Sequence, residues 1–206
     1  MDILSYLLGK KAGGGGGFSA NDIATRNYSG DLSGDATSIV MHAFRGSSIT
    51  SADFPEATSI GDYAFYGCSS LQSINIPKAT TIAYSAFYSC SQLKSVSFPA
   101  ATTLGTSVFT FCSLLEFADI GPGVSSLPSQ CFQNCSNKMI LILRKTGGIV
   151  TIANTSNVLP WDNSNYGALY VPSALIASYK ADTNWKKYLV DTYQIPVYAI
   201  EGSIYE

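Results

Sequence analysis

A repeat of about 22 residues constrains the fold of this 206-residue chain more than any other feature of its sequence. Residues of the same type recur with this period and form columns when the units are aligned. The Phe column consists of Phe44, Phe65, Phe87, Phe109 and Phe132, with spacings of 21, 22, 22 and 23 residues. The Cys column (Cys68, Cys90, Cys112, Cys135) and the Pro column (Pro55, Pro77, Pro99, Pro122) both have spacings of 22, 22 and 23. Independent columns that keep one period are not a chance arrangement, and they predict a solenoid.

Each unit also has the apolar spacing of a leucine-rich repeat. Leu71, Ile74 and Ile76 follow the pattern L-x-x-L-x-L, and the neighbouring units repeat it. A strand across the second half of this pattern turns alternate side chains inward, and the Pro at its end stops it. Because one unit cannot bury its own apolar face, we expect about five units to stack into a slab roughly 20–25 Å long. The first unit lacks one residue where the others have Cys, and the fourth has an extra residue, Gly121.

The repeat resembles a known family. Its pattern, P-x-A-T-x-I-x-x-x-A-F-x-x-C-x-x-L-x-S-x-x-x-P, is similar to the BspA-like leucine-rich repeats, also called the Treponema pallidum type, over residues 35–143. The resemblance implies a mainly β solenoid with short helices. It also implies a bacterial surface or secreted protein that binds host proteins, glycans or other cells. Similar repeats occur in proteins encoded by phages and prophages.

The chain before the repeats divides into two short segments. Residues 1–12 are predicted to form a helix with Ile3, Leu4, Leu7 and Leu8 on one face, and residues 13–17 are five consecutive glycines that predict a flexible hinge. The helix is either a frayed terminus or a docking peptide that joins a larger assembly or bundles with copies of itself. The leader looks like that of prophage tail-associated proteins, among which trimers are common. A secretory signal is not expected, because the start is acidic and the apolar part ends after Leu8.

The region after the repeats is expected to cap the solenoid. The solenoid with its N-terminal cap is assigned to residues 18–143, and an α/β capping region to residues 144–206. Strands are predicted at 139–143 and 148–153, around a turn at 145–148, and at 168–171. Ser173 is expected to cap a helix, and Trp185, Tyr188 and Leu189 to lie on a second amphipathic piece. The segment 170–188 resembles one that often closes arrays of this family, so its aromatic residues are interpreted as cap core.

The residues that catalysis would require are scarce. Cys68, Cys90 and Cys112 are interpreted as a ladder of buried thiols, although their spacing leaves oxidation open. Cys131 and Cys135 have a spacing that could bind zinc, but no further ligand pair accompanies them. The single His, His42, is expected at a variable, exposed position, and Glu116 with Asp119 is not repeated in other units. We therefore predict a protein that is not an enzyme and has no cofactor or metal.

Two faces of the solenoid are candidates for binding. The polar strand face is expected to carry Ser73, Asn75, Ser95, Ser97, Phe117 and Asp119 in columns. Tyr66 and Tyr88 directly follow the Phe column, with Tyr63 and Tyr84 nearby, and tyrosine offers a ligand a flat apolar face and a hydroxyl. The alternative is that these tyrosines only cover the side of the solenoid.

Charge and hydropathy narrow the function further. Charged residues make up 13% of the chain and the net charge is −2, which argues against nucleic-acid binding. No apolar run approaches the roughly 20 residues of a membrane span. The leading hypothesis is a recognition module, a receptor-binding or adhesion protein of a phage tail or tail-like particle that binds a bacterial surface glycan or protein. The alternatives are a scaffold component of a virion without a ligand of its own, and a bacterial surface or secreted adhesin.

Overall fold

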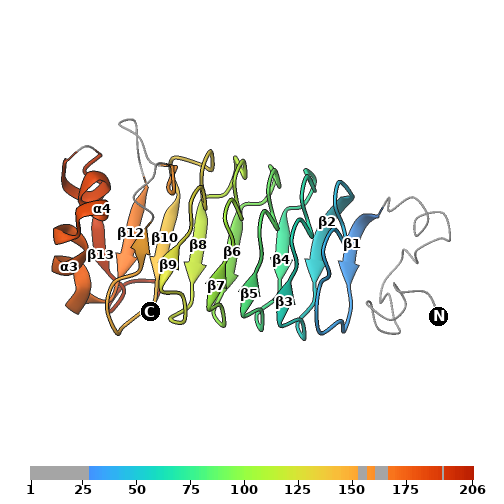
Figure 1. The fold of residues 1–206 in the computed structure, drawn as a ribbon, viewed down its shortest axis with the longest axis horizontal. Helices are drawn as coiled ribbons and strands as arrows, with labels where there is room; N and C mark the ends of the chain where they lie inside the picture. The colour runs from blue at the N-terminus through green and yellow to red at the C-terminus, as the bar shows by residue number, and fades with distance from the viewer. Residues whose placement is uncertain (1–27, 153–156, 161–166, 192) are drawn as a thin grey trace.

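A computed structural model describes residues 28–152, 157–160, 167–191 and 193–206, and these form a parallel β-solenoid closed by helices at its C-terminal end (Figure 1). The predicted solenoid of the leucine-rich-repeat type is therefore confirmed. The predicted docking helix, with Ile3, Leu4, Leu7 and Leu8, and the glycine hinge lie outside the described residues. No helix among the described residues is long and apolar enough to cross a membrane.

One face of the solenoid is built from the longer strands. In order along the axis they are β1 (Ser29–Ser33), β2 (Ser48–Asp53), β4 (Ser73–Asn75), β6 (Ser95–Phe98), β8 (Phe117–Ile120), β10 (Ile140–Leu143), β12 (Ala168–Val171) and β13 (Val197–Ala199). They form the parallel sheets β1-β2-β4 and β6-β8-β10-β12-β13. The strand stack thus begins with β1, before the first predicted unit, and continues through β12 and β13 in the predicted capping region.

A second face is built from two-residue strands. These are β3 (Ser59–Ile60), β5 (Thr81–Ile82), β7 (Thr103–Leu104), β9 (Ser126–Leu127) and β11 (Thr151–Ile152), paired in parallel as β3-β5-β7 and β9-β11. Threonine hydroxyls link successive units here, since Thr80 Oγ1 donates to Thr58 O at 3.1 Å and Thr102 Oγ1 to Thr80 O at 3.0 Å. The predicted strand at 148–153 is shortened to β11, which pairs with β9 and not with β10.

A turn segment of six residues carries each Phe column residue, at 41–46, 62–67, 84–89, 106–111 and 129–134. The residues two before and two after the Phe have a positive φ in every unit, for example Tyr63 (56°) and Gly67 (72°) around Phe65. Backbone bonds join each segment to the next, as from Phe65 N to Ala86 O at 2.8 Å. The sequence analysis placed the position of His42 on an exposed surface, but His42 is half-buried and Ser85 and Ser107 in the same column are buried. The backbone is left-handed at every position of the column, so contacts with the neighbouring unit decide the burial, as where the Ser107 hydroxyl donates to Gln130 Oε1 at 3.1 Å.

The core is a stack of phenylalanine rings flanked by thiols. Phe65, Phe87 and Phe109 stack with ring centroids 5.0 and 5.6 Å apart. Each thiol of the Cys column donates to a Phe carbonyl of the preceding unit: Cys68 to Phe44, Cys90 to Phe65, Cys112 to Phe87 and Cys135 to Phe109, at 2.9–3.1 Å. All five cysteines are free, which confirms the predicted ladder of thiols.

The first unit continues this column with a serine. Ser47 is buried and its hydroxyl lies 3.4 Å from Cys68 Sγ. Its N–H donates to Phe44 O, as that of Cys68 donates to Phe65 O. The residue missing from the first unit therefore lies between Ser47 and Ile49, and the Cys position itself is occupied.

The C-terminal cap consists of η1 (Ser173–Leu175), α3 (Ile176–Ala181), α4 (Thr183–Lys186) and a turn of π-helix, η2 (Lys187–Asp191). Trp185 Nε1 donates to Val150 O at 2.7 Å, and Val150 N donates to the Tyr179 hydroxyl at 2.9 Å. Both rings are fully buried, so these aromatic residues form cap core as predicted. The predicted capping role of the Ser173 side chain is wrong: its N–H donates to the Glu201 carboxylate at 2.9 Å, and its hydroxyl makes no cap.

Candidate recognition surface

The strand face presents the predicted columns of small polar side chains. Register pairs Ser51 with Ser73 and Asp53 with Asn75 between β2 and β4, and the Asn75 amide donates to Asp53 Oδ1 at 2.8 Å. Ser73, Asn75, Ser95 and Ser97 are all exposed. From β2 to β6 this surface offers hydroxyls and amides to a ligand but no large apolar side chain on which a partner could be anchored. Nearer the C-terminal end the same face carries Tyr198, which is 48% exposed and lies 5.1 Å from the Tyr170 ring.

The C-terminal residues of the chain cover the strand face at β8. Arg144 forms a bidentate ion pair with Asp119, at 2.7 and 3.1 Å, and also donates to Tyr205 O at 2.8 Å. The Phe117 ring lies 5.6 Å from the Tyr205 ring. Phe117 and Asp119 are therefore half-buried and do not share a free surface with the serines of β4 and β6.

The turn segments bring large aromatic side chains together on another side of the solenoid. We call Tyr63, Tyr66, Tyr84, Tyr88 and Phe111 the aromatic row. Tyr66 and Tyr88 stack with centroids 4.9 Å apart and an interplanar angle of 5°. Tyr84 lies edge-on to Tyr63 at 5.2 Å, and Phe111 edge-on to Tyr88 at 5.4 Å. The structure thus unites the four tyrosines that the sequence analysis selected and adds Phe111.

The cationic side chain of Arg45 lies at one end of the aromatic row. The Arg45 guanidinium lies 5.1 Å from the Tyr66 centroid and 5.9 Å from that of Tyr63, and the His42 ring stacks on Tyr63 at 5.1 Å. Partial burial is the main cause that raises the pKa of Tyr63 and Tyr88, so their hydroxyls remain neutral donors well above neutral pH. The row is therefore an amphipathic surface flanked by one cation, Arg45, and one carboxylate, Asp62, which accepts from the Tyr84 N–H at 3.0 Å.

Stacking changes what Tyr66 and Tyr88 can offer. Because their faces are turned toward each other, a ligand meets their edges and hydroxyls and not the flat faces that the sequence analysis expected. Tyr84 and Phe111 are the more exposed rings, at 43% and 45% of their surface. Apolar contact with a partner is therefore concentrated at these two residues, and polar contact at the stacked pair.

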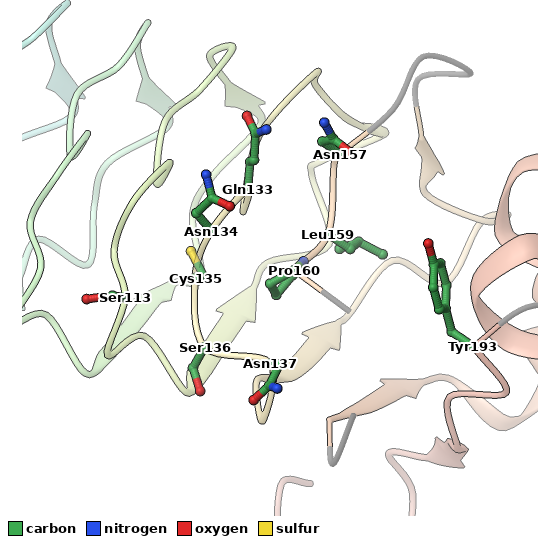
Figure 2. A pocket seen from close by; sticks show the side chains of 10 residues that line it. All are labelled: Ser113, Gln133, Asn134, Cys135, Ser136, Asn137, Asn157, Leu159, Pro160 and Tyr193. Carbon is green, nitrogen blue, oxygen red and sulfur yellow. The ribbon is translucent and has the colours of Figure 1, made fainter. Parts of the chain in front are cut away.

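An open pocket of about 600 Å³ lies where the last repeat meets the cap (Figure 2). Gln133, Asn134 and Cys135 stand on the repeat side and Tyr193 on the cap side, with Leu159 and Pro160 between them. Sequence reasoning missed this pocket, since one wall uses ordinary repeat positions such as Ser113 and Asn134, and the facing residues, Leu159, Pro160 and Tyr193, come from segments beyond the repeats, up to 80 residues away (Ser113 to Tyr193).

The side chains weighed as candidates for catalysis or metal binding are buried or engaged. No group of three or more His, Cys, Asp or Glu side chains among the described residues could hold a metal ion. Burial raises the pKa of Cys90 and Cys131 well above that of an ordinary thiol, which disfavours the nucleophilic thiolate. Asp119 is engaged by Arg144, so the Glu116–Asp119 pair is not a pair of free carboxylates.

Comparison with protein families agrees with the architecture. A family model described as the BspA-type leucine-rich repeat region matches residues 31–153 with six copies of the repeat. The crystal structure of a leucine-rich repeat protein from T. pallidum (TpLRR) is similar over 57% of this chain and 66% of that chain, with 19% sequence identity and a TM-score of 0.43. No curated protein sequence matches this chain.

Proposed function

This chain belongs to the BspA-type leucine-rich repeat family, and from that membership and the aromatic row we propose that it is a non-enzymatic recognition module that binds a glycan or protein on a cell surface. The single observation that carries the proposal is the aromatic row. It gathers five large rings from consecutive units on one side of a solenoid whose strand face is small and polar from β2 to β6. Clustered, partly exposed rings of this kind are typical of binding surfaces.

Some rings of the aromatic row mainly stabilise the fold, and others remain available to a partner. Each ring pair contributes roughly 0.5–1.5 kcal/mol to stability, so Tyr66 and Tyr88 have a structural role as well. Tyr84 and Phe111 are different, because much of each ring faces solvent and remains available to a partner. Their exposure supports a function beyond covering the side of the solenoid.

We place this module on a phage tail or tail-like particle, where it would act as a receptor-binding or adhesion protein. Residues 1–17 are the proposed connection to the larger assembly, with Ile3, Leu4, Leu7 and Leu8 as the docking face and a homotrimer as one arrangement. The support is the amphipathic sequence pattern followed by five glycines. Comparing the solution mass of the full chain with that of a chain lacking residues 1–17 tests this part; two identical monomers would contradict it.

The binding proposal is tested with fluorescently labelled protein and panels of intact bacterial cells. We expect the full chain to label at least one strain, and the double variant Tyr84→Ala/Phe111→Ala to lose that labelling. The matched control is Ser73→Ala/Ser95→Ala on the strand face, which should label cells as the unchanged chain does. Tyr66→Phe/Tyr88→Phe keeps the stacked rings and reports on the hydroxyls alone.

Three results would contradict this proposal. Absence of labelling on every strain would favour a scaffold component without a ligand of its own. Labelling lost in the serine variant and kept in the aromatic variant would move the binding surface to the strand face. Turnover of a cell-surface substrate would contradict the non-enzymatic assignment. Circular dichroism of each variant shows that the solenoid is intact before labelling is compared.

A further inference from the structure

The pocket between the last repeat and the cap continues the line of the aromatic row. Gln133 directly follows Phe132, just as Tyr66 follows Phe65 and Tyr88 follows Phe87. The Phe111 N–H donates to Gln133 O at 2.9 Å, which ties the exposed end of the aromatic row to the pocket wall. A ligand that extends along the turn segments therefore reaches the pocket after Phe111.

The pocket wall consists of neutral polar side chains. Gln133, Asn134 and Asn157 contribute amides, and Ser113 and Ser136 contribute hydroxyls. No charged residue is among the ten that line it. Amides and hydroxyls both donate and accept hydrogen bonds, so such a wall matches a ligand that carries many neutral hydroxyls.

The apolar part of the wall is small. Leu159, Pro160 and Tyr193 supply it, as Figure 2 shows. Two lysines adjoin the lining: Lys187 lies over the rings of Tyr188 and Tyr193 at 5.5 and 5.8 Å, and the exposed Lys138 directly follows Asn137. Neither lysine is itself a lining residue, so the side chains that line the pocket are neutral.

We propose that this pocket binds a unit of a neutral saccharide chain whose other units extend along Phe111 and the aromatic row. The inference rests on the proposed recognition function and names the ligand class and subsite for it. A volume of about 600 Å³ is typical of small-molecule sites, which span about 300–1,000 Å³. Polar groups fix a sugar's orientation by hydrogen bonds, and a flat apolar patch covers its C–H face.

The repeat itself suggests variants that should preserve the fold. Asn134 has a φ of 56°, and the same column holds Gly46 and Gly67, so Asn134→Gly removes an amide from the pocket at a position where the chain already uses glycine. Ser113→Trp fills the pocket with an indole. Ser69→Trp is the matched control, since Ser69 is exposed at the same column two units away and lies outside the pocket.

The experiment uses the full chain and a panel of neutral trisaccharides (maltotriose, cellotriose, mannotriose and chitotriose), with sulfated and sialylated oligosaccharides as charged comparators. Saturation-transfer NMR identifies binders and titration calorimetry gives their affinities. We expect at least one neutral trisaccharide to bind. Its affinity should fall by about 2- to 13-fold in Asn134→Gly, which corresponds to the loss of one hydrogen bond of about 0.5–1.5 kcal/mol. Ser113→Trp should abolish binding, and Ser69→Trp should leave it unchanged.

Other results would overturn the pocket assignment without touching the proposed function. Binding of charged saccharides alone would contradict a neutral ligand, and binding that survives Ser113→Trp would place the sugar elsewhere. Cell labelling that depends on Tyr84 and Phe111 but not on Ser113 or Asn134 would keep the recognition module and remove this subsite. A panel without any neutral binder would also refute the inference.

Discussion

Replacing Phe87 with alanine tests whether the stacked rings of the Phe column hold the solenoid together. The Phe87 ring is fully buried and contacts Phe65, Phe109 and Phe98 with centroids at 5.0, 5.6 and 6.1 Å. Phe→Ala in a packed core costs about 3–5 kcal/mol. We expect Phe87→Ala to lie near the upper end of this range, because neighbouring backbones held by turn-to-turn hydrogen bonds limit collapse into the cavity.

Two further variants set the scale of this effect. Phe132 is equally buried, but among the described residues its ring contacts only Phe109, at 5.4 Å. Phe132→Ala therefore removes one ring pair, whereas Phe87→Ala removes three. At about 0.5–1.5 kcal/mol for each of the two additional pairs, Phe132→Ala should cost about 1–3 kcal/mol less than Phe87→Ala. Phe111→Ala, at a ring that is 45% exposed, should change stability by less than about 1 kcal/mol.

Urea unfolding followed by circular dichroism measures all three variants under reducing conditions. Because a domain of this kind has a total stability of about 5–15 kcal/mol, the predicted loss in Phe87→Ala is a large and measurable fraction. The reasoning is refuted if Phe87→Ala costs no more than Phe111→Ala. An equal cost for Phe87→Ala and Phe132→Ala would refute the additive role of the stacked rings.

Three other predictions follow from the backbone, the thiols and the cap. Gly105→Ala should cost about 3 kcal/mol or more in a thermal melt, since a Cβ there would lie 2.4 Å from the backbone of Ala83 and Tyr84, whereas Gly147→Ala, with open space around it, should be neutral. Ellman's reagent at pH 8 should leave the four fully buried thiols unmodified in the native protein and should modify all five thiols after unfolding. Burial hides these thiols from the reagent and raises the pKa of thiols such as Cys90. Rapid modification of the native chain would contradict the ladder of buried thiols. Burial raises the pKa of Tyr179 to about 12, so the native state keeps a proton that the unfolded chain loses above pH 10, and stability should fall as pH rises from about 10 to 12. Tyr179→Phe should cost about 1 kcal/mol at pH 7, through loss of the acceptor for Val150 N, and should weaken this alkaline loss; an unchanged alkaline slope would contradict the assignment.

Most of the fold could be predicted because its contacts are nearly local. In a solenoid each residue meets its counterpart one turn away, so a period in the sequence is already a contact pattern. The Phe rings, the thiols of the Cys column and the strand register of Ser51 with Ser73 all follow from it. The exposure of the His42 column was misjudged, since it differs from unit to unit, from the buried Ser85 to the exposed Gln130, and a period cannot reveal such a difference.

Only part of the candidate binding surfaces could be predicted from the repeat period. The period placed Tyr66 and Tyr88 side by side, but the rotation that turns their faces toward each other depends on side-chain packing. The capping role assigned to Ser173 failed because the helical turn begins one residue earlier than expected: Ser173 lies inside η1 and Pro172 is at the N-cap position. Glu201, almost 30 residues away, accepts from the Ser173 N–H at this helix start. The pocket could not be predicted, because the residues that face its repeat wall, Leu159, Pro160 and Tyr193, belong to no repeat.

The sequence by itself determined a parallel stack of units, its Phe and Cys core, and a side rich in tyrosine, because a repeated apolar pattern can be buried only by stacking the units in register. The tertiary structure alone decided which of these surfaces remain free. Tyr205 and Arg144 cover Phe117 and Asp119, and the return of the chain through the cap brings Tyr193 opposite Asn134. Those contacts join residues that no period relates, so they depend on how the end of the chain folds back onto the array.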